Sequence, residues 1–159
     1  MNEIHSKAIL VGIGYKDFVM MDSLRNRDYT FPKASPQDSF PISGGAFNFL
    51  FFIKNEIIPY IDKAYRTETN NRTLMGHSLG AYFTLFVLMQ EILNTDHTFK
   101  NYVAASPSLH YGNKFLMDQW KQSVVYDNSI QQYLWLTCGA KEDIEDSTGT
   151  EGIDNFNSF

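Results

Sequence analysis

The residues best suited to chemistry are five consecutive ones, Gly76-His77-Ser78-Leu79-Gly80. A short apolar stretch precedes them, and a run without charged side chains follows from Leu79 to Met89. This order predicts a strand, a sharp turn and a buried helix, with Ser78 at the apex of the turn. Glycine lacks a Cβ and tolerates the strained backbone of such a turn. We therefore expect Ser78 to be a nucleophile and the Leu79 amide to stabilise an oxyanion at the helix N-terminus. The alternative is that the glycines only permit close packing and Ser78 caps the helix.

A serine nucleophile needs a base, which is normally a histidine oriented by a carboxylate. In hydrolases with this turn, the acid and then the histidine follow the serine along the chain. Glu142 and Asp143 come directly after an apolar segment, and Glu142 is preferred by position, with solvated surface charge as the alternative. His110 is the last histidine of the chain and precedes this acid. It is the candidate general base, and the alternative is a loop histidine that packs on Tyr111.

Candidate substrate-binding residues lie in the segment from Lys16 to Gly45, which shows no convincing periodicity and contains three prolines. The guanidinium groups of Arg25 and Arg27, next to the ring of Tyr29, could hold an anionic or polyhydroxylated substrate. Tyr15, which ends the first predicted strand, is a further candidate. The alternative is that the two arginines pair with aspartates and fix the loop.

The elements that would position these residues alternate between strand and helix patterns. A continuous apolar run predicts a strand that is buried on both faces of a parallel sheet. An apolar stripe with spacings of three and four residues predicts a helix that faces the sheet, and Pro59 predicts a kink or restart within it. The helix after Ser78 should be the most buried of the domain. The predicted elements are the strand Lys7 to Ile13, an irregular connection Lys16 to Gly45, a helix after Ser43-Gly44-Gly45 with the stripe Phe47, Leu50, Phe51, Ile57, Ile58, Ile61 and Tyr65, the helix Leu79 to Leu93, the strand Asn101 to Ser106, a short helix Phe115 to Lys121 and the strand Gln132 to Cys138.

This alternation predicts one α/β domain over residues 1–159, with a mainly parallel sheet and helices on both faces. Its 159 residues, 43% hydrophobic, can bury one core. The segment 142–159 is acidic and is expected to be a solvated or flexible tail.

Composition argues against several classes of function. A net charge of -5 without a basic stripe argues against nucleic-acid binding, and no apolar run reaches the length of a membrane span. No His, Asp and Glu cluster has metal-ligand spacing, and no cofactor is expected. Glu3, His5 and Lys7 interrupt any secretory signal, and the single Cys138 excludes an internal disulfide. We therefore expect a cytoplasmic protein.

A set of ordered motifs resembles the esterase branch of the α/β-hydrolase superfamily, which includes the enterochelin (ferric siderophore) esterases, esterase D and the mycolyltransferases. The resemblance extends from Ile9 to about Glu142. It rests on Val11-Gly-Ile-Gly-Tyr15, Arg27-Asp-Tyr-Thr30, Gly44-Gly45, Glu56-Ile-Ile-Pro-Tyr-Ile61, Tyr65-Arg66-Thr67, Arg72-Thr-Leu-Met-Gly-His-Ser-Leu-Gly-Ala81 and Ser106-Pro-Ser-Leu109.

The resemblance implies hydrolysis of a small-molecule ester through an acyl-enzyme on Ser78, with the Arg25 to Thr30 segment near the substrate. It also implies an earlier strand whose loop supplies a second oxyanion donor, and a later loop with the catalytic histidine. Neither is found in the sequence, so we expect an α/β-hydrolase-like domain truncated at both ends. Unpaired sheet edges would then favour a homodimer. A binding or assembly module without turnover is the alternative function.

Overall fold

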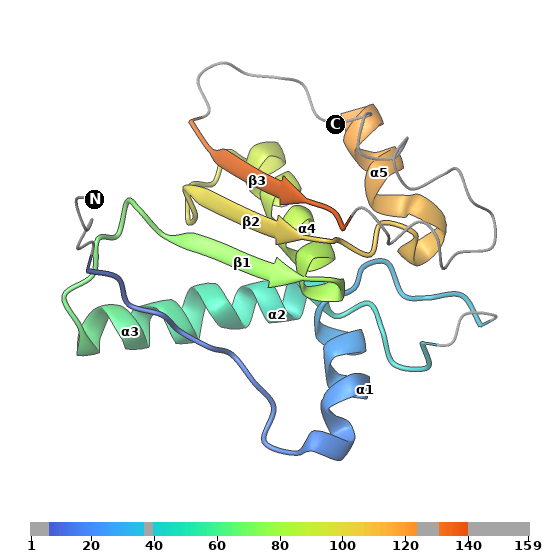
Figure 1. The fold of residues 1–159 in the computed structure, drawn as a ribbon, viewed down its shortest axis with the longest axis horizontal. Coiled ribbons are helices and arrows are strands. Elements are labelled where there is room, and N and C mark those ends of the chain that lie inside the picture. The colour runs from blue at the N-terminus through green and yellow to red at the C-terminus, as the bar shows by residue number, and fades with distance from the viewer. Residues whose placement is uncertain (1–6, 37–39, 124–130, 140–159) are drawn as a thin grey trace.

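The structure is a computed structural model that describes residues 7–36, 40–123 and 131–139. Its centre is a parallel sheet of three strands in the order β1-β2-β3, formed by β1 (Thr73–His77), β2 (Asn101–Ala105) and β3 (Tyr133–Thr137) (Figure 1). The register aligns Gly76 with Ala104, and Ala104 with Leu136. The carboxyl ends of the strands therefore meet at one edge of the sheet. The predicted strands around Asn101 and Gln132 are confirmed.

Helix α4 (Leu79–Asn94) forms the core of the fold. It packs against β1 and β2, and almost every residue between Leu79 and Met89 is buried. Its apolar character on all sides matches this environment, because other helices cover the surface that the sheet leaves free. The prediction that this helix is the most buried one is confirmed.

The predicted helix after Gly45 is divided into α2 (Ala46–Phe52), a π-helical turn η1 (Ile53–Ile57) and α3 (Ile58–Ala64). Pro59 lies in the first turn of α3, so the predicted restart is confirmed. The predicted stripe is wrong in part, because Phe47, Phe51 and Tyr65 are exposed. The buried side chains are those of Ala46, Phe49, Leu50 and Ile53. Phe49 contacts Phe83 of α4, with 5.1 Å between the ring centroids, so this face packs on a helix and not on the sheet.

The segment Lys7 to Ile13 does not form the buried strand that the sequence predicts. It is extended but unpaired within the part of the chain that the structure describes, and Leu10 is 86% exposed. A strand buried on both faces needs neighbouring strands and covering helices. No described strand bonds to this segment, so its apolar composition alone does not produce a strand.

The connection Lys16 to Gly45 contains a helix that the sequence analysis missed, α1 (Phe18–Asp28). The Asp17 carboxylate caps this helix by accepting a hydrogen bond from the Val19 amide at 2.8 Å. Arg25 and Arg27 lie in its last turn, where cations are favourable. The helix has no continuous apolar stripe, which explains why a search for periodicity did not find it.

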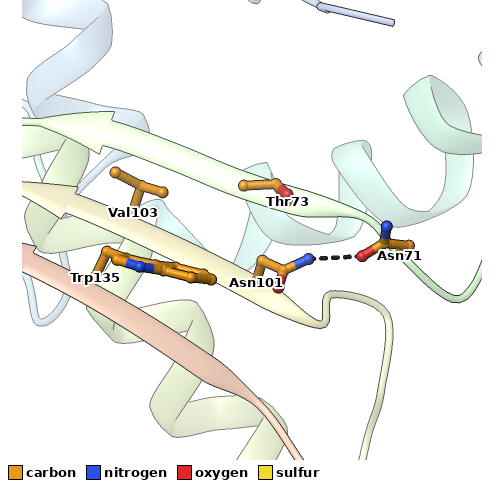
Figure 2. Close-up of a pocket in the computed structure, with 5 residues that line it drawn as sticks. All are labelled: Asn71, Thr73, Asn101, Val103 and Trp135. Atoms are coloured by element: carbon orange, nitrogen blue, oxygen red, sulfur yellow. Dashed lines mark hydrogen bonds between the residues drawn. The ribbon is translucent and has the colours of Figure 1, made fainter. Parts of the chain in front are cut away.

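The α/β class is confirmed, with parallel strands and connecting helices. Among the described residues, however, α4 is the only helix in extensive contact with the sheet, and it covers one face. The opposite face exposes Met75 and Trp135, which are aligned across the three strands with the partly buried Val103. A hollow of about 580 Å³ lies there, lined by Asn71, Thr73, Asn101, Val103 and Trp135 (Figure 2).

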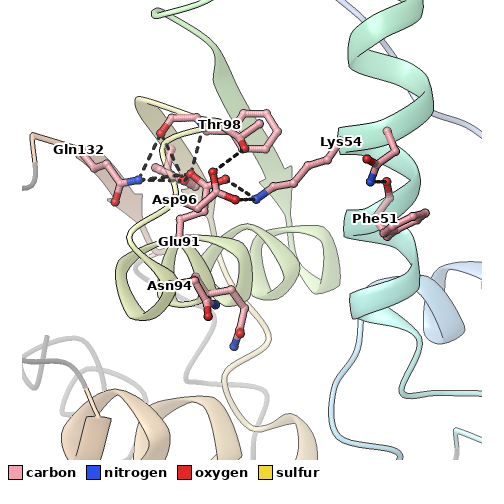
Figure 3. A network of polar contacts seen from close by, with 11 residues as sticks. Phe51, Lys54, Glu91, Asn94, Asp96, Thr98 and Gln132 are labelled. Atoms are coloured by element: carbon pink, nitrogen blue, oxygen red, sulfur yellow. Dashed lines mark hydrogen bonds and ion pairs between the residues drawn. The ribbon is translucent and has the colours of Figure 1, made fainter.

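A buried polar network joins the far end of α4 to its neighbours (Figure 3). The fully buried Glu91 carboxylate lies 3.0 Å from Lys54 Nζ of η1 and accepts hydrogen bonds from Tyr102 Oη and the Phe99 amide. Lys54 also pairs with Asp96. Burial opposes the charge on Lys54, but hydrogen bonds to Asp96 and Glu91 raise its pKa. The network therefore connects η1, α4 and β2.

The remaining helix, α5 (Tyr111–Ser123), begins with three residues of left-handed backbone, Gly112, Asn113 and Lys114. Regular helix therefore starts near Phe115, as the sequence predicts. No helix in the described ranges is long and apolar enough to cross a membrane. The predicted acidic tail 142–159 lies outside the described residues.

Candidate active site

The sharp turn between β1 and α4 has the geometry that the glycine pattern predicts. Ser78 has φ 55° and ψ -120°, a strained conformation for a residue with a side chain. The surrounding backbone holds it there. The Ser78 amide donates to the Ala105 carbonyl at 3.0 Å, and the Ser78 carbonyl accepts from the Ala81 and Tyr82 amides, each at 3.0 Å. The strand, turn and helix predicted around Ser78 are confirmed.

Ser78 opens into a hollow of about 220 Å³ at the carboxyl ends of the strands. Its lining comes from four parts of the chain: the end of α1, the segment before Gly45, the turn before α4 and the loop after β2. The lining residues are Arg25, Asn26, Phe40, Ser78, Leu79, Ser108, His110 and Tyr111. The larger hollow of about 580 Å³ on the open sheet face contains none of the predicted site residues. The smaller hollow is therefore the candidate site.

The hollow brings together four predicted residues that are distant in sequence: Arg25, Ser78, Leu79 and His110. Leu79 is the first residue of α4, where backbone N–H groups lack an acceptor within the helix. His110 is exposed and lies two residues beyond Ser108 in the loop after β2. The hollow therefore contains a hydroxyl, an imidazole, a helix N-terminus and a guanidinium. The predicted acid Glu142 and its neighbour Asp143 lie outside the described residues.

Arg27, Tyr29 and Tyr15 do not line this hollow. Arg27 makes two hydrogen bonds to the buried Asp28 carboxylate, with Nε at 2.6 Å and Nη2 at 3.0 Å from its oxygens. Tyr15 Oη donates to the same carboxylate at 2.9 Å, and the Tyr29 ring packs on Phe49 and Phe83.

The Asp28 cluster fixes the end of α1 in place. Hydrogen bonding to Asp28 raises the pKa of Arg27, and burial, together with Tyr29 and Asp28, raises the pKa of Tyr15. These contacts match the alternative in which the charges fix the loop. Substrate contact by Arg27, Tyr29 and Tyr15 stays a prediction.

Sequence reasoning missed two residues of the hollow, namely Asn26 and Phe40. Ser108 and Tyr111 lie just beyond the carboxyl end of β2, a position where parallel α/β sheets bind ligands, so the sequence places this segment near a ligand site. Asn26 and Phe40 carried no such signal. They reach the hollow only because α1 and the segment before Gly45 fold over the turn.

A parallel sheet with a strained serine between a strand and a buried helix, at the carboxyl edge of the sheet, defines an α/β-hydrolase-like fold with the sharp strand-to-helix turn called the elbow. The chain belongs to the esterase family whose model carries the description "Putative esterase" and matches residues 2–156.

Individual proteins agree with this assignment. The chain is 36% identical over 117 residues to the ferri-bacillibactin esterase BesA of Bacillus subtilis (strain 168), an alignment that covers 69% of this chain and 39% of BesA. The crystal structure of the BES protein from Bacillus cereus superposes with a TM-score of 0.65 at 30% identity and covers 75% of this chain and 44% of that one. The siderophore hydrolase EstA from Aspergillus nidulans gives a TM-score of 0.66 at 27% identity, covering 85% of this chain and 47% of EstA. The chain thus spans less than half the length of each of these relatives.

Proposed function

We propose that this chain carries the nucleophile of a serine carboxylic-ester hydrolase and forms an acyl-enzyme on Ser78. The observation that carries the proposal is the strained, half-buried Ser78 at the apex of the elbow, open to the 220 Å³ hollow. Strain at a polar residue that lines a hollow is typical of functional sites.

In the proposed reaction, Ser78 Oγ bonds to the ester carbonyl carbon while its proton passes to a general base. The bond from that carbon to the alkoxy oxygen then breaks, and the base returns the proton to the leaving alcohol. Water attacks the acyl-enzyme in the same way, releasing the acid and restoring Ser78. The Leu79 amide would donate to the carbonyl oxygen as it becomes negative, because it lies at the positive end of α4.

His110 is the proposed general base, since it lines the same hollow as Ser78. Glu142 is the proposed acid that orients it. The position of His110 in a loop allows its ring to turn toward Ser78 when substrate binds. Geometry in an empty site is often looser than in the working complex.

The proposed substrate is an ester of a siderophore. BesA is a ferri-bacillibactin esterase and EstA is a siderophore hydrolase, and this supports the proposal for their relative. Arg25 adds a physical argument, because it lines the hollow and its partner Asp22 lies 3.6 Å away and is largely exposed. Such a weakly held guanidinium can turn toward an anionic group of the substrate.

A fluorophosphonate probe tests the nucleophile directly, because an activated serine displaces fluoride and keeps the phosphonate. The wild-type chain should gain one phosphonate at Ser78 by intact mass and peptide mapping, and Ser78→Ala should gain none. His110→Ala should slow the labelling by about a hundredfold or more, and the matched variant His97→Ala should not. A folded wild-type chain that stays unlabelled would count against the proposal.

The second candidate function is a binding or assembly module that keeps the fold without turnover. One observation favours it: among the described residues, the hydrogen bond of Ser78 Oγ goes to Ser108 Oγ and not to a histidine. This function predicts a folded chain that hydrolyses no short-chain aryl ester at any pH and leaves the probe unreacted.

A further inference from the structure

A second serine lies beside the proposed nucleophile. The oxygens Ser78 Oγ and Ser108 Oγ are 3.2 Å apart, and either hydroxyl can donate to the other. The two residues are also joined through the backbone, since the Ser108 amide donates to the Ser78 carbonyl at 3.3 Å. Both residues line the 220 Å³ hollow. Ser108 is therefore held to the apex of the elbow by its side chain and by its main chain.

The loop that carries Ser108 is anchored on both sides. At its start, the Ser106 amide donates to the Thr137 carbonyl of β3 at 2.7 Å, and Ser106 adopts a positive φ of 48°. Beyond Ser108, the Tyr111 amide donates to the Ser108 carbonyl at 3.1 Å, and the buried Tyr111 donates through its hydroxyl to the Pro32 carbonyl at 2.8 Å. These contacts fix the backbone that carries the Ser108 hydroxyl before any substrate arrives. A group placed in advance in this way can act on a developing charge without reorganisation.

The separation of the two hydroxyls indicates when their contact matters. An O–H···O bond is usually about 2.7–2.8 Å long, so a distance of 3.2 Å corresponds to a weak bond in the resting state. Hydrogen bonds to an oxygen that gains negative charge become shorter and stronger. As Ser78 loses its proton to the base, its oxygen becomes such an acceptor, and Ser108 can donate to it.

From this geometry we infer that Ser108 is a positioning residue for the nucleophile. Its hydroxyl holds Ser78 Oγ toward the hollow and donates to that oxygen as the proton leaves. Ser108 keeps its own proton throughout and forms no bond to the substrate. The inference rests on the proposed function, because it gives Ser108 a role only in reactions of Ser78.

The test compares the rate of fluorophosphonate labelling in variants of the full chain. Ser108→Ala should lower the maximal labelling rate by about ten- to a hundredfold, because the lost bond matters most in the transition state. The concentration of probe at half-maximal rate should change little. Ser108→Thr keeps the hydroxyl and should restore most of the rate. Ser23→Ala, which removes a hydroxyl from α1 outside the hollow, should react like the wild type.

The pH profile and the melting temperature separate a positioning role from other roles. In Ser108→Ala the labelling rate should fall at every pH without a change in the shape of its pH profile, since the base is unchanged. The melting temperature should stay within about 3 °C of the wild type, because the resting bond is weak. If Ser108→Ala does not fold, Ser108→Cys, with a weakly hydrogen-bonding thiol of similar size, replaces it.

Each outcome decides the inference. Wild-type labelling together with an equal rate in folded Ser108→Ala would overturn the role of Ser108 and leave the proposed function intact. A loss of rate that Ser108→Thr does not restore would also overturn it. A wild-type chain that does not react at Ser78 would reject the proposed function, and the role of Ser108 with it.

Discussion

Gly76 and Gly80 touch across the elbow. A Cβ added to Gly76 would lie 2.1 Å from the carbonyl oxygen of Gly80, inside any allowed contact. The atoms nearest to this added Cβ are backbone atoms of Gly80 and Ala81, which cannot rotate away as a side chain can. Gly76 is the residue that lets β1 enter the turn directly beneath the first turn of α4.

Gly76→Ala should therefore destabilise the fold strongly, by about 3 kcal/mol or more, as expected when a rigid site is overpacked. Gly80→Ala is the matched control, because its added Cβ would meet only Tyr29 Cε2, at 3.9 Å. It should leave stability unchanged or raise it by up to about 1 kcal/mol, since alanine favours helix. Urea unfolding followed by circular dichroism measures both. Equal stability of the two variants would contradict the elbow geometry.

The Glu91 carboxylate is expected to be a structural group. Glu91→Ala removes the acceptor of Tyr102 and the Phe99 amide and leaves Lys54 half-buried without this carboxylate, which should lower the free energy of unfolding by about 3–5 kcal/mol. Glu91→Gln keeps the volume and one acceptor oxygen, so its loss should be smaller. Asp118→Ala, an exposed position on α5, is the control and should change stability by about 0.5 kcal/mol at most. Chemical denaturation of the three variants checks this order.

The pair of Lys54 and Asp96 predicts a specific pH dependence of stability. Burial disfavours the Asp96 charge, but hydrogen bonds and the charge of Lys54 lower its pKa in the folded chain. The stabilisation is therefore present above the ordinary aspartate pKa, near 4, and is lost as the pH falls below it. At alkaline pH the raised pKa of Lys54 has the corresponding effect. The stabilisation that charged Lys54 contributes is present below about pH 10.5 and is lost as the pH rises above that value.

Urea unfolding between pH 3 and 7 tests the acidic limb. Asp96→Asn should lose part of the fall in stability that the wild type shows below about pH 4. Identical acid limbs in the two proteins would show that Asp96 is not held in its charged form by Lys54.

The open face of the sheet predicts self-association. Met75 and Trp135 are 63% and 53% exposed and lie on the same face as Val103. Exposed apolar surface of this kind favours contact with a second copy. We expect the chain to dimerise as its concentration rises, and the double variant Met75→Glu, Trp135→Glu to remain monomeric. Leu93→Glu, an exposed site near the end of α4, should not alter the association. Sedimentation velocity over a concentration series distinguishes these outcomes.

The parts of the fold that the sequence predicts well are those where local pattern and burial agree. In the elbow, in α4 and in the strand at Asn101, the local sequence pattern predicts the element, and the same apolar residues are the ones that the fold buries. The predicted strand Lys7 to Ile13 is wrong because a buried strand needs neighbouring strands and helices, which its own residues do not specify. The prediction missed helix α1 for the opposite reason. Asp17 caps and stabilises this helix locally, while Phe18 and Val19 stay exposed, so no apolar stripe marks it in the sequence.

The residues of the candidate site also fall into two groups, those that a local pattern predicts and those that reach the hollow only through the fold. Ser78 and Leu79 follow from a motif whose geometry is local, and His110 follows from its place beyond a strand. Ser108 follows from the same position, whereas Asn26 and Phe40 enter the hollow only through contacts between distant segments, which no single stretch of sequence encodes. Arg25 was among the predicted residues, but its separation from Arg27 was not foreseen. Residues two positions apart on a helix point to nearly opposite sides, so Arg25 lines the hollow while Arg27 binds Asp28.

In the π-helical turn Ile53–Ile57, the amide of Ile58 bonds to the carbonyl of Ile53, five residues earlier instead of four. The turn therefore contains one residue more than an α-helical turn. Deleting a single residue there would restore an ordinary α-helical turn and remove the bulge, which carries Lys54 opposite Glu91. The spacing between Gly45 and Pro59 and the charge at position 91 are therefore linked. In related chains we expect a one-residue shortening here to be accompanied by an uncharged residue at the position of Glu91.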